Sequence, residues 1–311
     1  MKILFFGLGS IGKRHAKLLL DNFDHELFAF RSNENASKNE LEIPEIHELS
    51  EIGRIGIDVA FITNPTSEHM KYAKYCAEHG IDLFIEKPLT DKLGDAEEFT
   101  VLAKKNKTNV YVAYCLRFHP VISWLKEHLK DQKPIHASVY CSSYLPLWRP
   151  GQDHLKGYSA NKAMGGGALL DLSHEVDYLF YFFGKPDSLV ASGSRASNVT
   201  VDSDDFLDAI IQFPNTTCNL HLDFFSHKNR RDILLDFPTY SVFADLFNNR
   251  VELIKEGKSQ VIELPSERNE VFLKQLNYFF GNLGKKEQMN GLDEAMEVFE
   301  IIMHLKKEAE K

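Results

Sequence analysis

Several features that mark other classes of protein are scarce or missing in this sequence. Its four cysteines stand far apart without a CxxC pair, which predicts reduced thiols and argues against a zinc site or a disulfide framework. No apolar run approaches the roughly 20 residues of a membrane-spanning helix. The net charge of -9 comes without a basic block, so neither nucleic acid nor a membrane surface is an expected partner. We therefore expect a cytoplasmic protein that holds no metal.

What remains is the composition of a fully folded protein. Hydrophobic residues make up 43% of the 311 positions and charged residues 26%, which is ordinary for a globular chain of about two domains. The apolar opening at residues 3–8 is short, contains Gly7 and leads directly into Lys13 and Arg14. We interpret it as a buried strand and not as a secretory segment.

The first part of the chain alternates short apolar runs with amphipathic stretches. Such alternation predicts parallel strands that are covered by helices on both faces, the doubly wound α/β arrangement of a Rossmann domain. We assign residues 1–118 to this dinucleotide-binding domain. The expected strands are 3–6, 27–30, 59–63, 83–85 and 110–113, and the expected helices are 11–20, 67–79 and 96–105.

The second part, residues 119–311, reads as an α+β domain with a largely antiparallel, open-faced sheet. Apolar and polar residues alternate in several runs, and Pro214-Asn215 and Asn248-Asn249 are typical hairpin connections between them. We assign substrate binding and oligomerisation to this domain. Strands are expected at 135–142, 188–192, 206–213, 216–224, 233–237, 241–247 and 251–254, and helices at 167–183, 271–283 and 292–308.

The strongest single motif follows the first strand. Gly7, Gly9 and Gly12 fit the GxGxxG pattern, with Ser10 and Ile11 between the last two glycines. Gly7 permits a tight turn, Gly9 lets the backbone approach a pyrophosphate, and Gly12 lets the helix pack closely on the strand. The N–H groups that begin the helix then face the phosphates. This motif predicts a bound dinucleotide.

The residues after the second strand bear on which dinucleotide is bound. About 20 residues after the glycines, where NAD sites usually carry an acid for the ribose, the chain has Phe30-Arg31-Ser32. Arg31 and Ser32 suit a 2'-phosphate. We predict that NADP is preferred, with NAD possible. The alternative for Arg31 is a solvated surface side chain.

Two further motifs follow the third and fourth strands: Asn64-Pro65-Thr66-Ser67-Glu68-His69 and Glu86-Lys87-Pro88-Leu89. With the glycine loop and residues 114–120 and 165–174, they resemble the Gfo/Idh/MocA oxidoreductases, the family of glucose-fructose oxidoreductase and inositol dehydrogenase. The resemblance spans nearly the whole chain. It implies that Asn64, Pro65, His69, Glu86 and Lys87 lie at the cofactor, and that a cis bond often precedes the proline. Glu86 has an equally weighted alternative, a local pairing that holds the turn.

The same resemblance implies that Lys87, Asp171 and His174 act on the substrate. Hydride transfer at an alcohol carbon needs a group that exchanges the hydroxyl proton and a positive donor for the developing alkoxide. We expect His174 as the general base, Lys87 as the donor and Asp171 as the orienter of a hydroxyl. The family usually separates the aspartate and histidine by three residues, but only two intervene here, so Asp177 is the alternative partner of His174.

Substrate recognition is expected from the stretch before that helix. Trp148 offers an aromatic face to a sugar, Arg149 a bidentate donor to a carboxylate or phosphate, and Tyr158 a hydroxyl. An ordinary packed crossover is the alternative for this loop. Arg117, with His119, lines the same cleft or forms a structural salt bridge.

We expect an enzyme, an NAD(P)-dependent oxidoreductase that moves a hydride to or from a hydroxyl carbon of a sugar, sugar acid, polyol or nucleotide sugar. The alternatives are a glycosidase-type enzyme whose bound cofactor is oxidised and re-reduced in each cycle, and a non-catalytic dinucleotide-binding regulator. The open sheet needs a cover, which predicts a homodimer or homotetramer.

Overall fold

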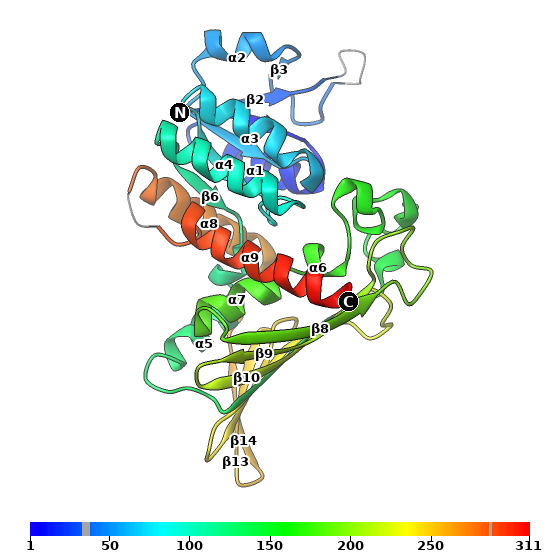
Figure 1. The fold of residues 1–311 in the computed structure, drawn as a ribbon. Helices are drawn as coiled ribbons and strands as arrows, with labels where there is room; N and C mark the ends of the chain where they lie inside the picture. Colours follow the sequence, from blue (N-terminus) through cyan, green and yellow to red (C-terminus); the bar gives the residue numbers. More distant parts are fainter. Residues whose placement is uncertain (33–37, 286–287) are drawn as a thin grey trace. The chain divides into compact units, whose positions relative to one another are not determined.

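The structure is a computed structural model that describes residues 1–32, 38–285 and 288–311 (Figure 1). These residues form two compact units. The first combines Met1–Ala113 with Phe272–Met296, and the second combines Tyr114–Val271 with Glu297–Lys311. Neither unit is one uninterrupted stretch, because the chain returns to the first unit near its end. The assignment of functions to residues 1–118 and 119–311 stays a prediction.

The first unit contains a six-stranded sheet in the order β3-β2-β1-β4-β5-β6, in which every neighbouring pair is parallel. Its central strands β1, β4 and β5 are buried almost throughout, as continuous apolar runs predict for a sheet covered on both faces. The predicted doubly wound fold is confirmed. The strands are β1 (Lys2–Phe6), β2 (Glu26–Phe30), β3 (Glu45–Ile46), β4 (Val59–Ile62), β5 (Asp82–Ile85) and β6 (Val110–Val112).

Helices cover both faces of this sheet. On one face, His15 of α1 and Phe272 of α8 have ring centroids 5.5 Å apart, and Phe279 of α8 packs on Phe61 and Phe84. On the other face, α3 packs beside α4. The short β3 and the helix after it were not predicted. The helices are α1 (Ser10–Asn22), α2 (Leu49–Ile55), α3 (His69–Glu78), α4 (Leu93–Asn106) and α8 (Arg268–Asn282).

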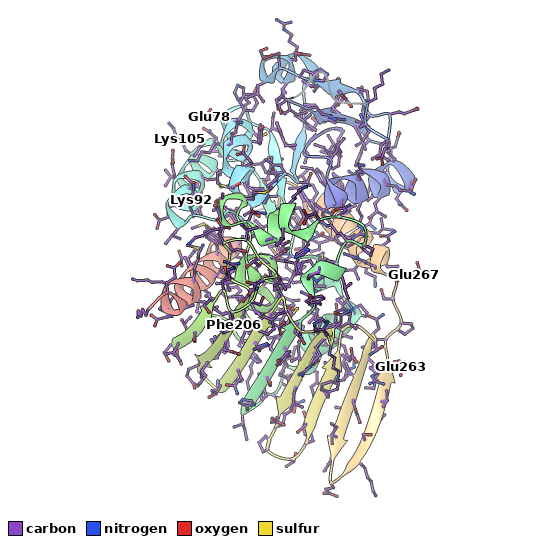
Figure 2. The ribbon with its side chains drawn as sticks, turned by 90° about the vertical axis from the view of Figure 1, so that its right-hand side faces the viewer. Glu78, Lys92, Lys105, Phe206, Glu263 and Glu267 are labelled. Atoms are coloured by element: carbon purple, nitrogen blue, oxygen red, sulfur yellow. The ribbon has the colours of Figure 1, made fainter. Side chains whose placement is uncertain are left out.

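The second unit contains an eight-stranded sheet in the order β14-β13-β12-β11-β7-β10-β9-β8. Figure 2 shows these strands side by side, with Phe206 at the start of β9 and Glu263 at the end of β14. The strands are β7 (His136–Ser142), β8 (Ser188–Ser194), β9 (Phe206–Phe213), β10 (Thr216–Asp223), β11 (Arg230–Asp236), β12 (Ser241–Asp245), β13 (Arg250–Lys255) and β14 (Lys258–Glu263). Both predicted hairpins, β9–β10 and β12–β13, are confirmed.

One strand pair differs from the antiparallel expectation. β7 and β10 are parallel, whereas all other neighbours in this sheet are antiparallel. Parallel strands need a long crossover between them. Here the crossover is the stretch from residue 143 to residue 215, which carries the helices with Asp171 and His174 before the chain returns through β8 and β9.

Helices cover one face of the second sheet, where the alternating residues Leu207, Ile211, Leu220 and Leu222 are buried. The helices are α5 (Pro120–His128), α6 (Ala168–Asp171), α7 (His174–Phe183) and α9 (Leu292–Ala309), whose first residues belong to the first unit. Short 3-10 helices lie at Thr66–Glu68, Cys115–Phe118, Leu145–Leu147, His154–Lys156, Tyr158–Ala160 and Lys162–Met164.

The single helix predicted over residues 167–183 is wrong. The structure has two helices, α6 and α7, and the chain leaves helical geometry at Leu172, whose φ is -94° and ψ 29°. Tertiary contacts fix each helix separately. Asp204 accepts the backbone N–H of Leu169 at the start of α6, and Asp177 of α7 is held by Arg117. Two anchors at different positions outweigh the local preference for one continuous helix.

Candidate cofactor and catalytic sites

The glycine loop joins β1 to α1 and leaves no room for side chains at two of its positions. Gly7 has a φ of +107°, and a Cβ there would lie 2.6 Å from the backbone nitrogen of Asn64. A Cβ on Gly12 would lie 2.2 Å from the carbonyl oxygen of Gly7. At Gly9 a Cβ would meet nothing within 4 Å. The packing of the loop therefore requires glycine at positions 7 and 12, whereas the space next to Gly9 is open.

The N-terminus of α1, where Ser10 and Ile11 lie, is suited to a phosphate. Gly9 is the N-cap residue, so no side chain caps the helix, and the first turn contains no acidic residue. The N–H groups of a first turn have no partner within their helix, and the helix dipole adds positive potential there. A pyrophosphate at this position would satisfy groups that the chain itself leaves available.

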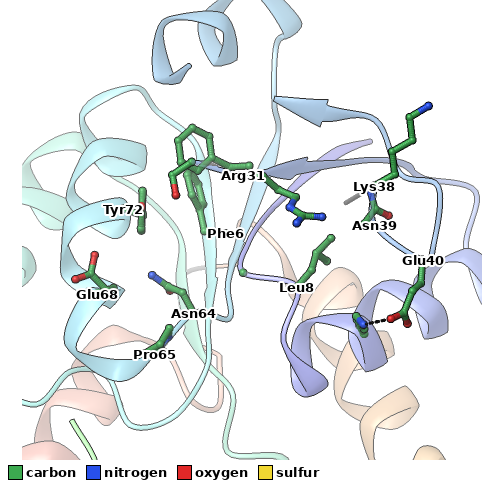
Figure 3. A pocket seen from close by; sticks show the side chains of 14 residues that line it. Phe6, Leu8, Arg31, Lys38, Asn39, Glu40, Asn64, Pro65, Glu68 and Tyr72 are labelled. Carbon is green, nitrogen blue, oxygen red and sulfur yellow. Dashed lines mark ion pairs between the residues drawn. The ribbon is translucent and has the colours of Figure 1, made fainter. Parts of the chain in front are cut away.

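A cavity of about 560 Å³ lies beside the loop (Figure 3). Of the predicted cofactor residues, Gly7, Arg31, Ser32, Asn64 and Pro65 line it, whereas Gly9, Ser10, Ile11, Gly12, His69, Glu86 and Lys87 do not. The other lining residues are Phe6, Leu8, Lys13, Phe30, Lys38, Asn39, Glu40, Glu68 and Tyr72. The cavity thus joins the ends of β1, β2 and β4, at the edge where open α/β sheets bind ligands.

Arg31 is held at the cavity wall by an acid that the sequence did not reveal. Its Nη1 lies 3.1 Å from Oε1 of Glu45, and the backbone N–H and side-chain amide of Asn39 donate to the same oxygen at 2.9 and 2.7 Å. The Asn39 hydrogen bonds lower the pKa of Glu45 below its ordinary value, burial opposes this, and Arg31 adds to the lowering. Glu45 therefore carries a negative charge at neutral pH and orients Arg31.

Two further walls of the cavity were missed by sequence reasoning. Tyr72 of α3 stacks on Phe6 with ring centroids 4.5 Å apart, which gives an aromatic side. Lys13 forms an ion pair with Glu40 at 2.8 Å, drawn as the dashed line in Figure 3, and Lys38 lies on the same side as Arg31. Residues 33–37 lie outside the described part of the chain. Tyr72 has no local signal in the sequence, because only the packing of α3 brings it to β1.

The segment after β4 is joined to the glycine loop. The hydroxyl of Thr63 donates to the carbonyl oxygen of Gly7 at 2.5 Å. The side-chain amide of Asn64 is buried with no hydrogen-bond partner among the described residues. A buried amide in that state is expected to bond a ligand or water. Asn64 is thus a group of the cavity wall that a cofactor would satisfy.

His69 is placed behind the cavity and not in its wall. It is 1% exposed, its Nε2 lies 3.0 Å from the carbonyl oxygen of Asn64, and its Nδ1 lies 3.2 Å from that of Pro88. Burial lowers the pKa of His69, and its hydrogen bonds oppose this only partly. A neutral imidazole carries one N–H, so His69 donates to one of these segments at a time, and its ring lies between the segment after β4 and the segment after β5.

The Glu86-Lys87-Pro88 segment follows β5, and its Lys87–Pro88 peptide bond is cis. Glu86 is 9% exposed, with Oε1 at 2.7 Å from Nε2 of His15 in α1. Its Oε2 accepts the backbone N–H of Lys87 at 3.3 Å. Glu86 thus pairs with the backbone of the turn and with α1, and its role at the cofactor stays a prediction.

In the second unit, Arg117 forms a buried ion pair. Its guanidinium donates to both oxygens of Asp177 at 2.6 to 3.1 Å, and the side chains are 1% and 0% exposed. The salt bridge given as the alternative for Arg117 is confirmed. Asp177, the alternative partner of His174, is therefore engaged by a cation. His119 is the N-cap of α5, where its Nδ1 accepts the backbone N–H of Val121.

Asp171 and His174 lie at the end of α6 and the start of α7. Asp171 accepts hydrogen bonds from the hydroxyls of Tyr158 at 2.7 Å and Ser159 at 2.5 Å, which fix both of its oxygens. His174 is 8% exposed, and its Nε2 lies 4.0 Å from Sγ of Cys115. The two side chains thus belong to different helices, each with its own neighbours.

The loop with Trp148 and Arg149 lies on the surface of the second unit. Trp148 is 36% exposed, packs edge-on against Phe224 at 5.1 Å and donates from Nε1 to the hydroxyl of Ser143. Arg149 is exposed. An exposed indole whose N–H is already used offers mainly its ring to a ligand.

Neither a metal site nor a membrane-spanning helix is found among the described residues. In the described ranges, no group of three or more His, Cys, Asp or Glu side chains is placed to hold a metal ion. Among the helices that the structure describes, none is long and apolar enough to cross a membrane. The thiols of Cys76, Cys115, Cys141 and Cys218 are all buried and free of disulfides.

Comparison with protein families agrees with both units. Residues 1–114 match the model described as "Oxidoreductase family, NAD-binding Rossmann fold", and residues 135–245 match the "GFO/IDH/MocA C-terminal domain". The chain belongs to the Gfo/Idh/MocA oxidoreductases. The resemblance stated from the motifs is confirmed, and so is the expectation of an oxidoreductase.

Individual members of the Gfo/Idh/MocA family are distant relatives. An uncharacterized oxidoreductase of Streptococcus pneumoniae is 23% identical over 85% of this chain and 74% of its own length. The scyllo-inositol 2-dehydrogenase (NAD(+)) of Bacillus subtilis is 28% identical over 45% of this chain and 40% of its own. The solved UDP-N-acetylglucosamine 3-dehydrogenase of Acidithiobacillus ferrooxidans has a TM-score of 0.82 at 18% identity, over 100% of this chain and 98% of that one.

Proposed function

We propose that this Gfo/Idh/MocA oxidoreductase transfers a hydride between a nicotinamide dinucleotide and a hydroxyl-bearing carbon of a sugar, sugar acid, polyol or nucleotide sugar. The observation that carries the cofactor half is the glycine loop with its open space at Gly9 and the uncapped α1 above it. The names of the relatives, an inositol dehydrogenase and a nucleotide-sugar dehydrogenase, support the substrate half.

The residues present fit such a cofactor. Gly9 and the first turn of α1, with Ser10 and Ile11, would hold the pyrophosphate, and the cavity wall at Arg31 and Ser32 would hold the adenosine ribose. The unsatisfied amide of Asn64 would bond the bound molecule. When bound, the nicotinamide would supply or accept the hydride.

We propose NADP as the preferred form. Arg31 donates to Glu45 through Nη1, and this contact orients the guanidinium at the cavity wall. Ser32 and Lys38 also line the cavity. Two cations and a hydroxyl form a suitable environment for a 2'-phosphate.

The proposed catalytic roles rest on the chemistry of three side chains. His174 would take the hydroxyl proton as general base, because an imidazole exchanges protons near neutral pH. Lys87 would donate a hydrogen bond to the oxygen that develops negative charge. Asp171, whose oxygens are fixed by Tyr158 and Ser159, would orient a substrate hydroxyl. Trp148 and Arg149 would contribute a ring face and a cation to substrate binding.

The test is a substrate screen with pyranoses, sugar acids, inositols and nucleotide sugars, each with NADP and NAD, followed by absorbance of the reduced nicotinamide. We expect stoichiometric reduction with at least one substrate class. Lys87→Met should lower kcat by about 100-fold or more, with the NADPH dissociation constant nearly unchanged. Lys105→Met, on the exposed surface of α4, is the matched control. Unchanged turnover in Lys87→Met would refute the role of Lys87.

We also propose that the second unit forms a homodimer or homotetramer through the uncovered face of its sheet. Val190 and Ile210 are paired neighbours on that face and are 58% and 53% exposed. The face is mixed in character, because Asp208, His221 and Tyr140 follow in one row across the strands. Sedimentation of the wild type should give a multiple of 35.6 kDa, and Ile210→Arg should reduce it. A wild-type monomer would refute this assembly.

A further inference from the structure

Glu86 lies at the centre of a short chain of contacts between α1 and the segment that carries Lys87. Its Oε1 is 2.7 Å from Nε2 of His15, and its Oε2 accepts the backbone N–H of Lys87. Both oxygens of one buried carboxylate are thus used, one for each neighbour. The carboxylate of Glu86 therefore lies between His15 and the backbone of Lys87.

The side chain of His15 is surrounded by aromatic rings, and its polar contact among the described residues is the carboxylate of Glu86. It is 0% exposed, and the rings of Phe84, Phe272 and Phe61 lie edge-on to it at 5.1, 5.5 and 5.9 Å. Its Nδ1 has no hydrogen-bond partner among the described residues. Since only Nε2 meets a polar group, the ring proton belongs on Nε2, which then donates to Glu86. The aromatic rings fix the direction of this donor.

The other side of the same turn is held by His69, whose Nδ1 lies 3.2 and 3.3 Å from the carbonyl oxygens of Pro88 and Leu89. Buried imidazoles from two helices thus lie on the two sides of Lys87: His15 contacts Glu86 before it, and His69 contacts the carbonyl oxygens of Pro88 and Leu89 after it. His15 also differs from His69 in its position relative to the glycine loop. It lies in α1, the helix whose first turn follows the glycine loop.

We propose that His15 is a positioning residue for Lys87. Through Glu86, it fixes the backbone of Lys87 relative to α1 and hence relative to the glycine loop at the start of that helix. A shift of about 1 Å in a reacting group can cost about 100-fold in rate. A rigid link between the glycine loop and Lys87 would therefore help to keep the reaction fast. The catalytic value of this link rests on the proposed function, in which Lys87 acts on the substrate. The existence of the link does not depend on that function.

The experiment compares His15→Gln, His15→Met and Glu86→Gln in the full chain without cofactor. The amide nitrogen of Gln reaches the position of Nε2 and can still donate to Glu86, whereas Met cannot. His25→Met is the matched control, because His25 also packs on aromatic rings, those of Phe23 and Phe280, but has no contact with the turn. The readouts are hydrogen exchange of the amides of residues 86–89 and the acetylation rate of each lysine, both by mass spectrometry.

We expect His15→Met to accelerate exchange at the Lys87 amide by about tenfold, the effect of losing one charged hydrogen bond, and to change the acetylation rate of Lys87 relative to Lys105. His15→Gln should restore wild-type values, and His25→Met should leave them unchanged. If His15→Met does not fold, Glu86→Gln supplies the test, because it replaces one of the two accepting oxygens, Oε1 or Oε2, by an NH2 group that cannot accept. Wild-type exchange and acetylation at Lys87 in folded His15→Met, or in Glu86→Gln, would overturn the proposal.

A separate experiment with added cofactor distinguishes a failure of this inference from a failure of the proposed function. Added NADPH should protect Lys87 from acetylation in the wild type if Lys87 lies at the nicotinamide. Absence of protection would count against the role of Lys87 at the cofactor. The exchange measurements need no cofactor, so they decide the role of His15 independently.

Discussion

The guanidinium of Arg117 and the carboxylate of Asp177 form a fully buried ion pair, with Nη2 of the arginine 2.6 Å from Oδ1 of the aspartate. The pair joins the 3-10 helix Cys115–Phe118 to the first turn of α7, the turn that begins with His174. The ring of Tyr181 also lies 4.7 Å from the Arg117 guanidinium carbon. The turn that begins with His174 is therefore held by the Arg117–Asp177 pair, together with the ion pair between Arg231 and Glu175.

Removing one partner of this pair should destabilise the second unit strongly. Asp177→Asn leaves a buried guanidinium without its counter-charge, which typically costs about 3–5 kcal/mol. Denaturant unfolding measures the change. The matched control is Glu98→Gln at the exposed pair with Lys74, where less than about 1 kcal/mol is expected. Equal effects at the two sites would contradict the importance of the buried pair.

The glycine loop predicts two different defects for two similar substitutions. Gly12→Ala places a Cβ 2.2 Å from the Gly7 carbonyl oxygen, so both the melting temperature and NADPH affinity should fall. Gly9→Ala meets no protein atom within 4 Å, so the melting temperature should hold while affinity falls about tenfold or more through contact with the pyrophosphate. Gly53→Ala in α2, also unobstructed, is the control and should bind normally. Normal binding by Gly9→Ala would place the pyrophosphate elsewhere.

Cofactor preference should depend on Arg31. Arg31→Gln removes the charge that faces the proposed 2'-phosphate, so NADPH affinity should fall by about 10- to 100-fold, the value of a charge-assisted hydrogen bond. NADH affinity should change much less. Arg54→Gln, an exposed residue in the last turn of α2, is the control. Fluorescence titration with both cofactors gives the ratio, and an equal loss for both would assign Arg31 a structural role.

His221 should make the stability of the second unit depend on pH. Burial lowers the pKa of this imidazole, but the hydrogen bonds that its ring N–H groups donate to Asp223 and Asp208 outweigh burial and raise the pKa above its ordinary value of 6.5. A raised pKa in the folded state stabilises the protein fully below pH 6.5 and loses this contribution as the pH rises through the folded value.

The unfolding free energy of the wild type should therefore decline as the pH rises from 6.5 through the folded pKa of His221. His221→Gln should remove the part of this decline that His221 causes. The surrounding groups are Tyr140, stacked on the ring at 4.2 Å, and Arg230, which lies over Tyr140 at 3.8 Å. His304→Gln, on the exposed side of α9, is the control. A parallel decline in wild type and His221→Gln would show that another group is responsible.

Local patterns in the sequence determined the main architecture. Continuous apolar runs such as Ile3–Phe6 and Val59–Ile62 identify buried parallel strands because both faces of such a sheet are covered. The hairpins at Pro214-Asn215 and Asn248-Asn249 follow from the backbone preferences of those residues. The roles of Gly7 and Gly12 could be assigned from the sequence, because the loop has no room for a side chain at these two positions.

Other features depend on residues that lie far apart in the chain. The short β3 brings Glu45 to Arg31, α1 brings His15 to Glu86 over 71 positions, and the fold brings Arg117 to Asp177 over 60. No local period encodes such pairs.

The same reason explains the division of the predicted helix at Leu172 and the parallel pairing of β7 with β10. Anchors elsewhere in the fold override local propensity there. The sequence alone determined which chemical groups are present and which elements carry them. Only the tertiary structure decided which groups neutralise, orient or bury one another, because electrostatic and hydrogen-bond partners are selected by distance in space.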